Sequence, residues 1–378
     1  MLQNTWLVWA LLVGWSGFSI WAANRTKIGK YLGFVNMGIL GGLVFVNLGI
    51  MPSAHDAYKA VSNYFIPIGI CLVLFMANLR ELAKCGVKLV LTFVVTGIVM
   101  IFMGVVGCKI FNLGPEASKL GAVAISNLTG NLQTAAGTAV SIGISDEAYA
   151  FFNAATAIVW VLYSFVAFMI GNTFVPKFLT SYKSDKANLG FTQEENENAL
   201  KEMSATEYTV NISEVAIVIG VAVAIAGVGN WLGEITGFYS IVFYATLGVL
   251  VANFTPIKNY KVNDHLATVI FTMYMVTIGC SAHWSKFTMM PWQLFLFIAW
   301  MFFGSLGVMI LVSKVLRLPW EYMLISHMAC AGGPVSTPPM AKSYGWTDLA
   351  LPGIVIAVLG QVFGAYCGLL GMMIANLF

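Results

Sequence analysis

Two apolar runs of this 378-residue chain carry the residues best suited to bind a ligand. In the first run, 118–141, hydroxyl and amide side chains gather midway, at Ser126, Asn127, Thr129, Asn131, Gln133 and Thr134, beside Gly130. In the second run, 320–343, Gly332, Gly333 and Pro334 precede Ser336 and Thr337. Glycine adds backbone freedom and proline removes a hydrogen-bond donor, so the sequence predicts a broken helix in each run.

A broken helix inside lipid must either be buried in protein or line a cavity, because unpaired backbone groups are costly there. Such a break could bind an anionic solute at the ends of its half-helices and Na⁺ through carbonyl, hydroxyl and amide oxygens. We expect Na⁺ ligands among Asn127, Thr129, Asn131, Ser336 and Thr337. The alternative is that glycine and proline only kink each helix, while Ser and Thr bond their own backbone.

Four further polar residues lie inside apolar runs. His327 is either a proton carrier or a neutral histidine that satisfies freed backbone groups. Asn153, Thr156 and Gln361 either face the same cavity or join neighbouring helices. Gly360, Gly364 and Gly368 recur every four residues, a pattern that indicates close helix packing within the fold, with a dimer face as the alternative.

The composition requires a membrane for these elements. Hydrophobic residues make up 59% of the chain and charged residues 9%, too few to cover a soluble domain. The formal charge of +3 is too small and too scattered to indicate nucleic acid, and the six cysteines show no framework or metal spacing. Twelve apolar runs are predicted, near 5–23, 32–51, 60–79, 87–108, 118–141, 148–175, 208–229, 236–254, 263–282, 289–313, 320–343 and 348–376.

The chain has two similar halves. A shift of 202 positions places Gly130 over Gly332, Asp146 over Asp348 and Lys84 over Lys286. We therefore predict an all-α polytopic membrane protein with two duplicated repeats of about five to six helices, each with a discontinuous helix. The first membrane repeat covers 1–176 and the second 208–378, with a hydrophilic linker at 177–207 that could also be regulatory.

The distribution of Lys and Arg favours inverted repeats. In the first half these residues favour an N-terminus outside the cytoplasm, and in the second half the bias reverses. Six full crossings in the first half would instead make the repeats parallel. Either one run is not a full crossing, or another membrane element lies near the linker, or the charge argument fails, so the number of crossings stays open.

The segment from Gly332 to Ala341, with Ser343–Asp348 and Leu351–Gly353, resembles the closing signature of a bacterial membrane family, domain of unknown function 819. That family resembles cation/proton antiporters and bile-acid-type symporters. This resemblance implies crossing discontinuous helices, a core from runs four to six and ten to twelve, elevator-like alternating access, a bacterial inner membrane location and, in many members, a homodimer. The antiporters' paired aspartates are replaced here by Phe152-Asn153-Ala154-Ala155, which disfavours their proton mechanism.

From these features we expect an Na⁺- or H⁺-coupled secondary transporter of a small polar or anionic organic solute, working in the lipid bilayer without any other cofactor. An ion or solute channel with its pore at the broken helices is the alternative. No nucleotide-binding or hydrolase motif occurs, so we expect no catalytic residues; His327 and Cys330 lie one turn apart but have no activating partner in the sequence.

Overall fold

The computed structural model describes residues 4–182, 189–204, 211–281 and 291–377, and over these ranges the chain is almost entirely helical. In the first half the helices are α1 (Thr5–Arg25), α2 (Lys27–Asn47), α3 (Asp56–Ala60), α4 (Ile66–Leu74), α5 (Leu79–Leu82), α6 (Val87–Ile110), α7 (Ala117–Gly130), α8 (Leu132–Ile142), α9 (Asp146–Met169) and α10 (Val175–Phe178). Then follow α11 (Gln193–Ser204), α12 (Ile212–Thr236), α13 (Ser240–Phe254), α14 (Val262–Ser281), α16 (Trp292–Ala299), α17 (Ser305–Leu316), α18 (Trp320–Gly332), α19 (Thr337–Ser343) and α20 (Ala350–Leu377).

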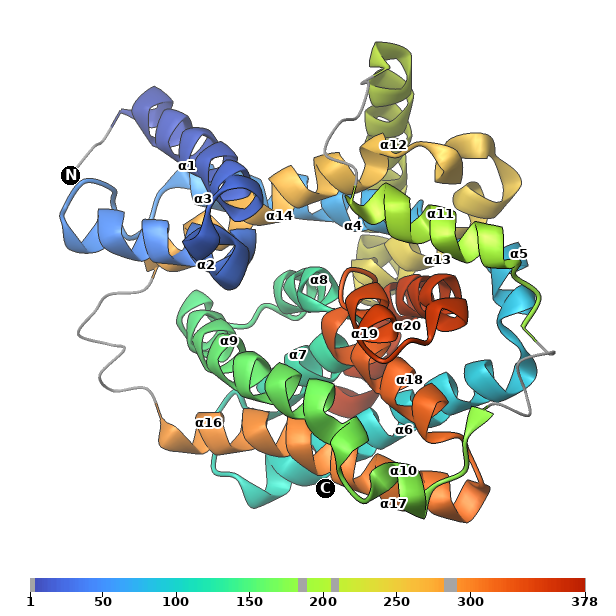
Figure 1. Cartoon of the computed structure of the whole chain (residues 1–378). Helices are drawn as coiled ribbons and strands as arrows, with labels where there is room; N and C mark the ends of the chain where they lie inside the picture. The colour runs from blue at the N-terminus through green and yellow to red at the C-terminus, as the bar shows by residue number, and fades with distance from the viewer. Residues whose placement is uncertain (1–3, 183–188, 205–210, 282–290, 378) are drawn as a thin grey trace.

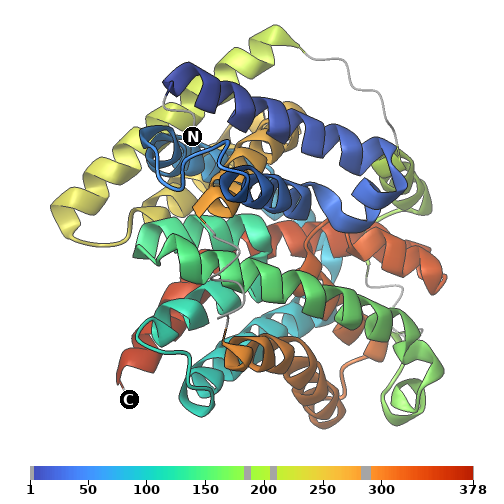
Figure 2. The ribbon, with the colours of Figure 1, turned by 90° about the vertical axis from the view of Figure 1, so that its left-hand side faces the viewer.

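The helices form two groups. Helices α1–α4 and α12–α14 pack on one another and form a scaffold, shown in the upper part of Figure 1. Helices α6–α9 and α16–α20 form a core below them. The core contains the six runs that the family resemblance implied for it. In Figure 2 the long helices run side by side across the molecule.

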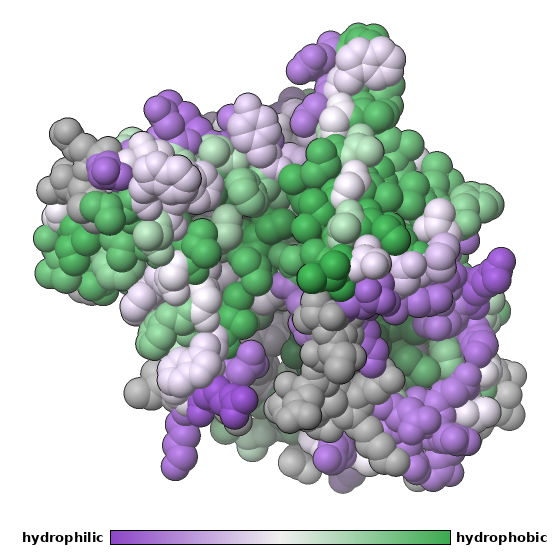
Figure 3. All heavy atoms as spheres, turned by 90° about the horizontal axis from the view of Figure 1, so that it is seen from above, coloured by the Kyte–Doolittle hydropathy of each residue, from purple (hydrophilic) through white to green (hydrophobic). Residues whose placement is uncertain are grey.

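Seven helices in the described part of the chain are long and apolar enough to cross a membrane. Large apolar side chains such as Trp6, Val87 and Ile98 stand exposed on them. Figure 3 shows apolar side chains across the middle of the scaffold face, with hydrophilic ones toward its margins. The protein is therefore a multi-pass integral membrane protein, with lipid as the solvent for this apolar surface.

Two of the twelve predicted runs are not full crossings. Helices α7 and α8 fold back on each other at Asn131, and the Ser126 and Thr138 hydroxyls hydrogen-bond across the fold at 2.7 Å. At their open end, the Ser145 hydroxyl donates to the Glu116 carboxylate at 2.5 Å. The run 118–141 is thus a helical hairpin that returns to the side it entered. The crossing discontinuous helix that the resemblance implied is wrong here.

The run 320–343 forms the second hairpin, α18–α19. Its first residue, Trp320, contacts Trp346 just beyond its end, with ring centroids 4.8 Å apart. Near the turn, the Ser336 hydroxyl oxygen lies 3.3 Å from the Met328 carbonyl oxygen. Local sequence predicted both breaks, but the direction the chain takes after each break depends on contacts between residues far apart in the fold.

Helix α20 shows that the two hairpins approach from opposite ends. Near the start of α20, a Cβ at Gly353 would lie 3.0 Å from Thr337 Cβ of the second hairpin. Further along, a Cβ at Gly368 would lie 2.6 Å from the Ala122 carbonyl oxygen of α7. The 28 residues of α20 span about 42 Å. The second hairpin therefore lies along the first part of α20, and the first hairpin along the last part.

The glycine stripe of α20 allows this packing. Gly360, Gly364 and Gly368 all face α7, where a Cβ would meet backbone atoms of Thr129, Gly130 and Ala122. Tight packing within the fold, one of the two predictions for this stripe, is confirmed, and the dimer face is wrong. Small residues at such positions let two helix backbones approach closely.

The connections between helices gather at two ends of the molecule. At one end, which we call the linker end, the Lys258 ammonium donates a hydrogen bond to the Asn78 side chain. The Gly171 amide of the first half donates to the Tyr344 hydroxyl, and the Tyr182 hydroxyl of the linker donates to the Asp348 carboxylate. At the other end, Ser281 hydrogen-bonds to Asp146. The linker is more than solvated chain, since α11 packs on α20 and Asn196 accepts a hydrogen bond from the Leu351 amide at 3.0 Å.

Candidate functional site

The tips of the two hairpins touch each other near the middle of α20. The tip residue of the first is Asn131 (φ 94°, ψ 176°) and that of the second is Gly333 (φ 70°, ψ −167°). These residues are separated by the 202 positions that relate the two halves. A Cβ at Gly333 would lie 3.1 Å from Asn131 Nδ2 and 3.2 Å from Asn131 Cβ. Both breaks are therefore real, matched in conformation and in contact.

Asn131 compensates for its unusual backbone. L-residues rarely adopt positive φ, and such a conformation costs about 1–3 kcal/mol. The Asn131 side chain accepts hydrogen bonds from the backbone N–H groups of Gln133, at 2.9 Å, and Thr134, at 3.2 Å. It thereby caps α8, a contribution of about 1 kcal/mol. The expected half-helix end is present, but its side-chain cap already satisfies two of its amides.

The second tip uses glycine and serine instead. Gly333 adopts positive φ without a Cβ, and Pro334 follows it. The Ser336 hydroxyl lies 2.8 Å from the Gly333 carbonyl oxygen, to which it donates. Gly332 has no room for a side chain, because a Cβ there would overlap Trp160 of α9. Gly332 and Gly333 are thus packed against α9 and the first tip, whereas Val335 of the same segment is 72% exposed.

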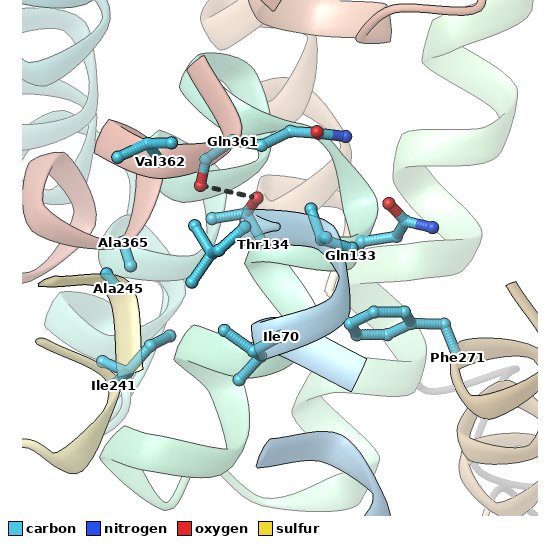
Figure 4. Close-up of a pocket in the computed structure, with 11 residues that line it drawn as sticks. Ile70, Gln133, Thr134, Ile241, Ala245, Phe271, Gln361, Val362 and Ala365 are labelled. Atoms are coloured by element: carbon cyan, nitrogen blue, oxygen red, sulfur yellow. Dashed lines mark hydrogen bonds between the residues drawn. The ribbon is translucent and has the colours of Figure 1, made fainter. Parts of the chain in front are cut away.

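A narrow cavity lies beside the first tip, between core and scaffold (Figure 4). Gln133, Thr134 and Gln361 line it from the core, and the Thr134 hydroxyl lies 3.1 Å from the Gly130 carbonyl oxygen and 3.5 Å from that of Gln361. Almost all of the cavity's surface is apolar, and its other lining residues are Ile70, Val73, Leu74, Ile241, Ala245, Phe271, Val362 and Ala365. Its volume of about 10 Å³ has room for about one water molecule.

Four predicted residues keep buried polar atoms without a protein partner among the described residues. They are Asn127, with both amide atoms, and Asn153, Thr156 and Gln361, each through one oxygen. All four side chains are less than 5% exposed. Leaving a buried polar atom unpaired costs about 1–3 kcal/mol. These atoms are therefore the ones best suited to contact an ion, a solute or water.

The other predicted Na⁺ ligands are bonded locally. The Thr129 hydroxyl donates to the Ile125 carbonyl oxygen at 2.7 Å, and the Thr337 hydroxyl lies 3.4 Å from that of Pro334. A hydroxyl that donates its hydrogen still has lone pairs that can accept a cation. Thr129, Ser336 and Thr337 bond their own backbone, as the kink alternative expected, and their role as Na⁺ ligands stays a prediction.

His327 lies apart from the cavity, in a closed hydrogen-bond chain. Its Nδ1 lies 2.6 Å from the Tyr163 hydroxyl and its Nε2 2.9 Å from the Ser305 hydroxyl. Because Ser305 donates its hydrogen to the backbone carbonyl oxygens of Met301 and Phe302, between α16 and α17, Nε2 donates to Ser305 and Nδ1 accepts from Tyr163. The ring is fully buried. It bonds side chains, so the expectation that it satisfies freed backbone is wrong.

Sequence reasoning missed the scaffold side of the cavity. Ile70, Ile241 and Phe271 come from three separate apolar helices and carry no polar signal. Tyr163, by contrast, was detectable as a hydroxyl within an apolar run.

No group of three or more His, Cys, Asp or Glu side chains that could hold a metal occurs within the described ranges.

The comparisons with known proteins agree with the membrane architecture. The family model "Protein of unknown function (DUF819)" matches residues 10–377. The chain belongs to this family. It is also 22% identical over 388 residues to "Uncharacterized membrane protein YjcL" of Bacillus subtilis (strain 168), an alignment that covers 97% of this chain and 96% of that protein. Membership of the family predicted from the closing segment is confirmed.

Proposed function

We propose that this protein is an ion-coupled secondary transporter of a small polar organic solute, with Na⁺ as the favoured coupling ion. The observation that carries the proposal is the contact between two hairpin tips that enter from opposite ends of the core. Each tip reaches the middle of α20, where it could take part in a site accessible from either side in turn. Half-helix ends and broken backbone at mid-membrane depth are the usual setting of transporter sites.

The hairpins support inverted repeats. With a hairpin in place of the fifth run, the first half crosses the membrane five times instead of six. Its α1 packs through Val8 and Leu12 near Met51 and Cys280, at the end opposite the linker. Its α9 finishes at the linker end, where the second half begins. An odd number of crossings is what inversion requires.

The charges agree with this arrangement. The Lys and Arg residues at the linker end include Arg25, Lys27, Arg80, Lys84, Lys88, Lys177, Lys258, Lys261, Lys314, Arg317 and Lys342, whereas Lys59, Lys109 and Lys119 lie at the other end of the described part. Because positive residues collect in cytoplasmic loops, the linker end is the cytoplasmic one. The N-terminus and C-terminus would then both face away from the cytoplasm of the bacterial inner membrane.

The division into core and scaffold supports alternating access by an elevator-like movement. The cavity at Gln133, Thr134 and Gln361 lies where the two groups meet. Displacement of the core along the scaffold would open it first toward one end and then toward the other. A carrier is favoured over a channel, since the cavity has a volume of only about 10 Å³. A catalytic role is not proposed, and a homodimer stays an expectation of the resemblance.

Na⁺ is favoured over H⁺ because the unpaired groups near the breaks are uncharged amides and hydroxyls, which bind a cation through oxygen but do not take up a proton near neutral pH. Asn127 lies one turn before the first tip and has both amide atoms unpaired. His327, the proton alternative, is enclosed between Tyr163 and Ser305. In this proposal Asn127 and the hydroxyls of Thr129, Ser336 and Thr337 bind Na⁺, while Gln133 and Gln361 contact the solute.

The test is uptake by purified protein in liposomes. A solute should accumulate against its own gradient when Na⁺ is higher on one side, and the flux should saturate. Flux that persists unchanged when every ion gradient is removed would contradict coupling. Unitary current steps in a planar bilayer would replace the carrier by a channel.

A further inference from the structure

The two hairpins differ in how far their returning helices are covered. The shift of 202 positions that relates the two halves places Gln133 of α8 over Val335, and Gly137 of α8 over Pro339 of α19. In the first hairpin Gln133 is half-buried and Gly137 is buried. In the second hairpin Val335 is 72% exposed, and Pro339 is exposed as well. Equivalent positions of the two halves therefore have different surroundings, although the two tips touch each other.

The covered face of α8 packs on the scaffold. Helix α8 lies against α4 and α13. A Cβ at Gly137 would lie 2.6 Å from Ile70 Cδ1 and 3.2 Å from Ile241 Cδ1, so the two surfaces meet without a gap. Further along α20, toward the end opposite the linker, the Tyr366 hydroxyl lies 2.8 Å from the Thr246 hydroxyl of α13. Core and scaffold are therefore in contact along the half of the molecule that the first hairpin enters.

The corresponding face of α19 is exposed from the tip to the linker end. Pro339, Lys342 and Ser343 are exposed and lie on one side of the helix, and Val335 precedes them in the turn. Helix α19 packs on α18 and α20, which belong to the core, and among the described residues it has no comparable packing on a scaffold helix. Figure 1 shows α19 on the same side of the core as α8, the side toward the scaffold. The repeat thus directs this exposed face toward the scaffold too.

We infer that the exposed face of α19 is the wall of a water-filled path from the linker end to the two tips, and that the contact of α8 with the scaffold closes the opposite path. The path rests on the proposed function, for which it names the end from which the site is reached. In the opposite state the two faces exchange, so that α19 packs on the scaffold at Pro339 and Gly137 separates from Ile70. The rival arrangement is a Val335 side chain that faces lipid.

Cysteine labelling distinguishes a water-filled path from lipid. A thiol reacts as its thiolate, which forms in water and is strongly disfavoured in an apolar medium. Val335→Cys would be treated with a membrane-impermeant maleimide in vesicles of each orientation. We expect labelling only from the side on which Glu197→Cys of the linker is labelled. Ile98→Cys is the matched control and should stay unlabelled from both sides, since Ile98 is 60% exposed midway along α6, on the lipid-facing surface.

Each labelling result has one meaning. Labelling of Val335→Cys from the side opposite the linker, or from neither side, would overturn the inferred path. The unmodified protein supplies the background, because its six cysteines are buried or half-buried. The measurement needs no solute and no ion gradient. Labelling from the linker side without any ion-driven uptake would support the path and contradict the transport proposal, and ion-driven uptake with Val335→Cys unlabelled would do the reverse.

The closed side can be tested by adding bulk at its contact. Gln133→Cys should be labelled slowly from the end opposite the linker, because Gly137 packed on Ile70 and Ile241 blocks that path. Gly137→Val overpacks this contact, which should raise that labelling rate about tenfold, and Gly137→Ala should act in the same direction if valine prevents folding. Gly97→Val is the control, since a Cβ there meets nothing within 4 Å. Rates that stay unchanged in both Gly137 variants would overturn the closure at α8.

Discussion

The two hairpins reach the same backbone conformation with different chemistry. At the first tip, Asn131 holds a positive φ and its side chain caps the following helix. At the second tip, Gly333 avoids the steric conflict and Ser336 binds the carbonyl oxygen that the break frees. The first tip faces a cavity toward the scaffold, whereas at the second tip Gly332 packs against Trp160 of α9 and Val335 is exposed. Matched geometry in the two halves therefore does not require matched side chains.

The difference assigns the hairpins different tasks. The first carries the groups that remain available, Asn127 and Gln133, and so is the better candidate for binding. The second is fixed by His327 within the membrane and by Glu321, which accepts from Ser181 and Tyr182 of the linker. A hairpin fastened at its base and middle is suited to support the first tip. Substitutions in the second hairpin should therefore lower stability, whereas substitutions in the first should alter ligand binding.

The largest expected effect is at the second tip. Gly333→Val should destabilise the protein by about 3 kcal/mol, since positive φ is strained for a β-branched residue and the added Cβ would lie 3.1 Å from Asn131 Nδ2. Thermal unfolding in detergent measures this. Gly345→Val is the control, because Gly345 also has positive φ (71°) but open space around it. Equal losses in both variants would show that the tip contact contributes nothing.

The second effect concerns the support of that hairpin. His327→Phe should cost about 2 kcal/mol of stability, because it leaves the buried Tyr163 hydroxyl without its partner. Adding Tyr163→Phe should recover part of the loss, a coupling that a double-mutant cycle detects. Ion-driven uptake should survive in His327→Phe if Na⁺ is the coupling ion. Its complete loss in a folded variant would instead favour proton coupling through His327.

The third effect tests the first hairpin as an ion site. Asn127→Leu should raise stability by about 1 kcal/mol in Na⁺-free buffer, because it removes buried amide atoms that have no protein partner. The same variant should lose the stabilisation that Na⁺ gives the unmodified protein, which reaches about 2.7 kcal/mol at a hundred times the dissociation constant. Unfolding midpoints in Na⁺ and choline buffers measure both. An unchanged Na⁺ response would exclude Asn127 as a ligand.

The smallest effect lies at the linker. The Thr192 backbone amide and then the Lys84 ammonium hold the pKa of Glu195 below its usual value. This contact contributes fully above the unfolded-state pKa of Glu195 and is lost as pH falls through the lower folded-state pKa. Glu195→Gln should therefore make the linker slightly easier to cleave by protease at neutral pH. The exposed Glu197→Gln is the matched control, and equal cleavage of both variants would contradict a role for the Lys84 contact.

Some features followed from sequence alone because they are local. Apolar runs defined the membrane helices. Glycine and proline located the second break at Gly332–Pro334, and the polar cluster from Ser126 to Thr134 contained the first break, at Asn131. The spacing of Gly360, Gly364 and Gly368 indicated the close helix contact. Each of these features depends on the backbone conformation or the burial that a residue type tolerates. Both can be inferred from the residue and its neighbours in sequence.

The tertiary structure decided the rest. The residues at a helix break do not determine whether the chain continues across the membrane or turns back, because both paths free the same backbone groups. Contacts such as Ser126 with Thr138, and α20 with both hairpins, select the turn. Likewise, only packing determined which polar side chains are paired. Thr129 and Asn131 hydrogen-bond to backbone groups of neighbouring residues, while Asn127 and Gln361 keep unpaired atoms. Such pairings join residues that are distant in sequence, so residue type alone could not distinguish them.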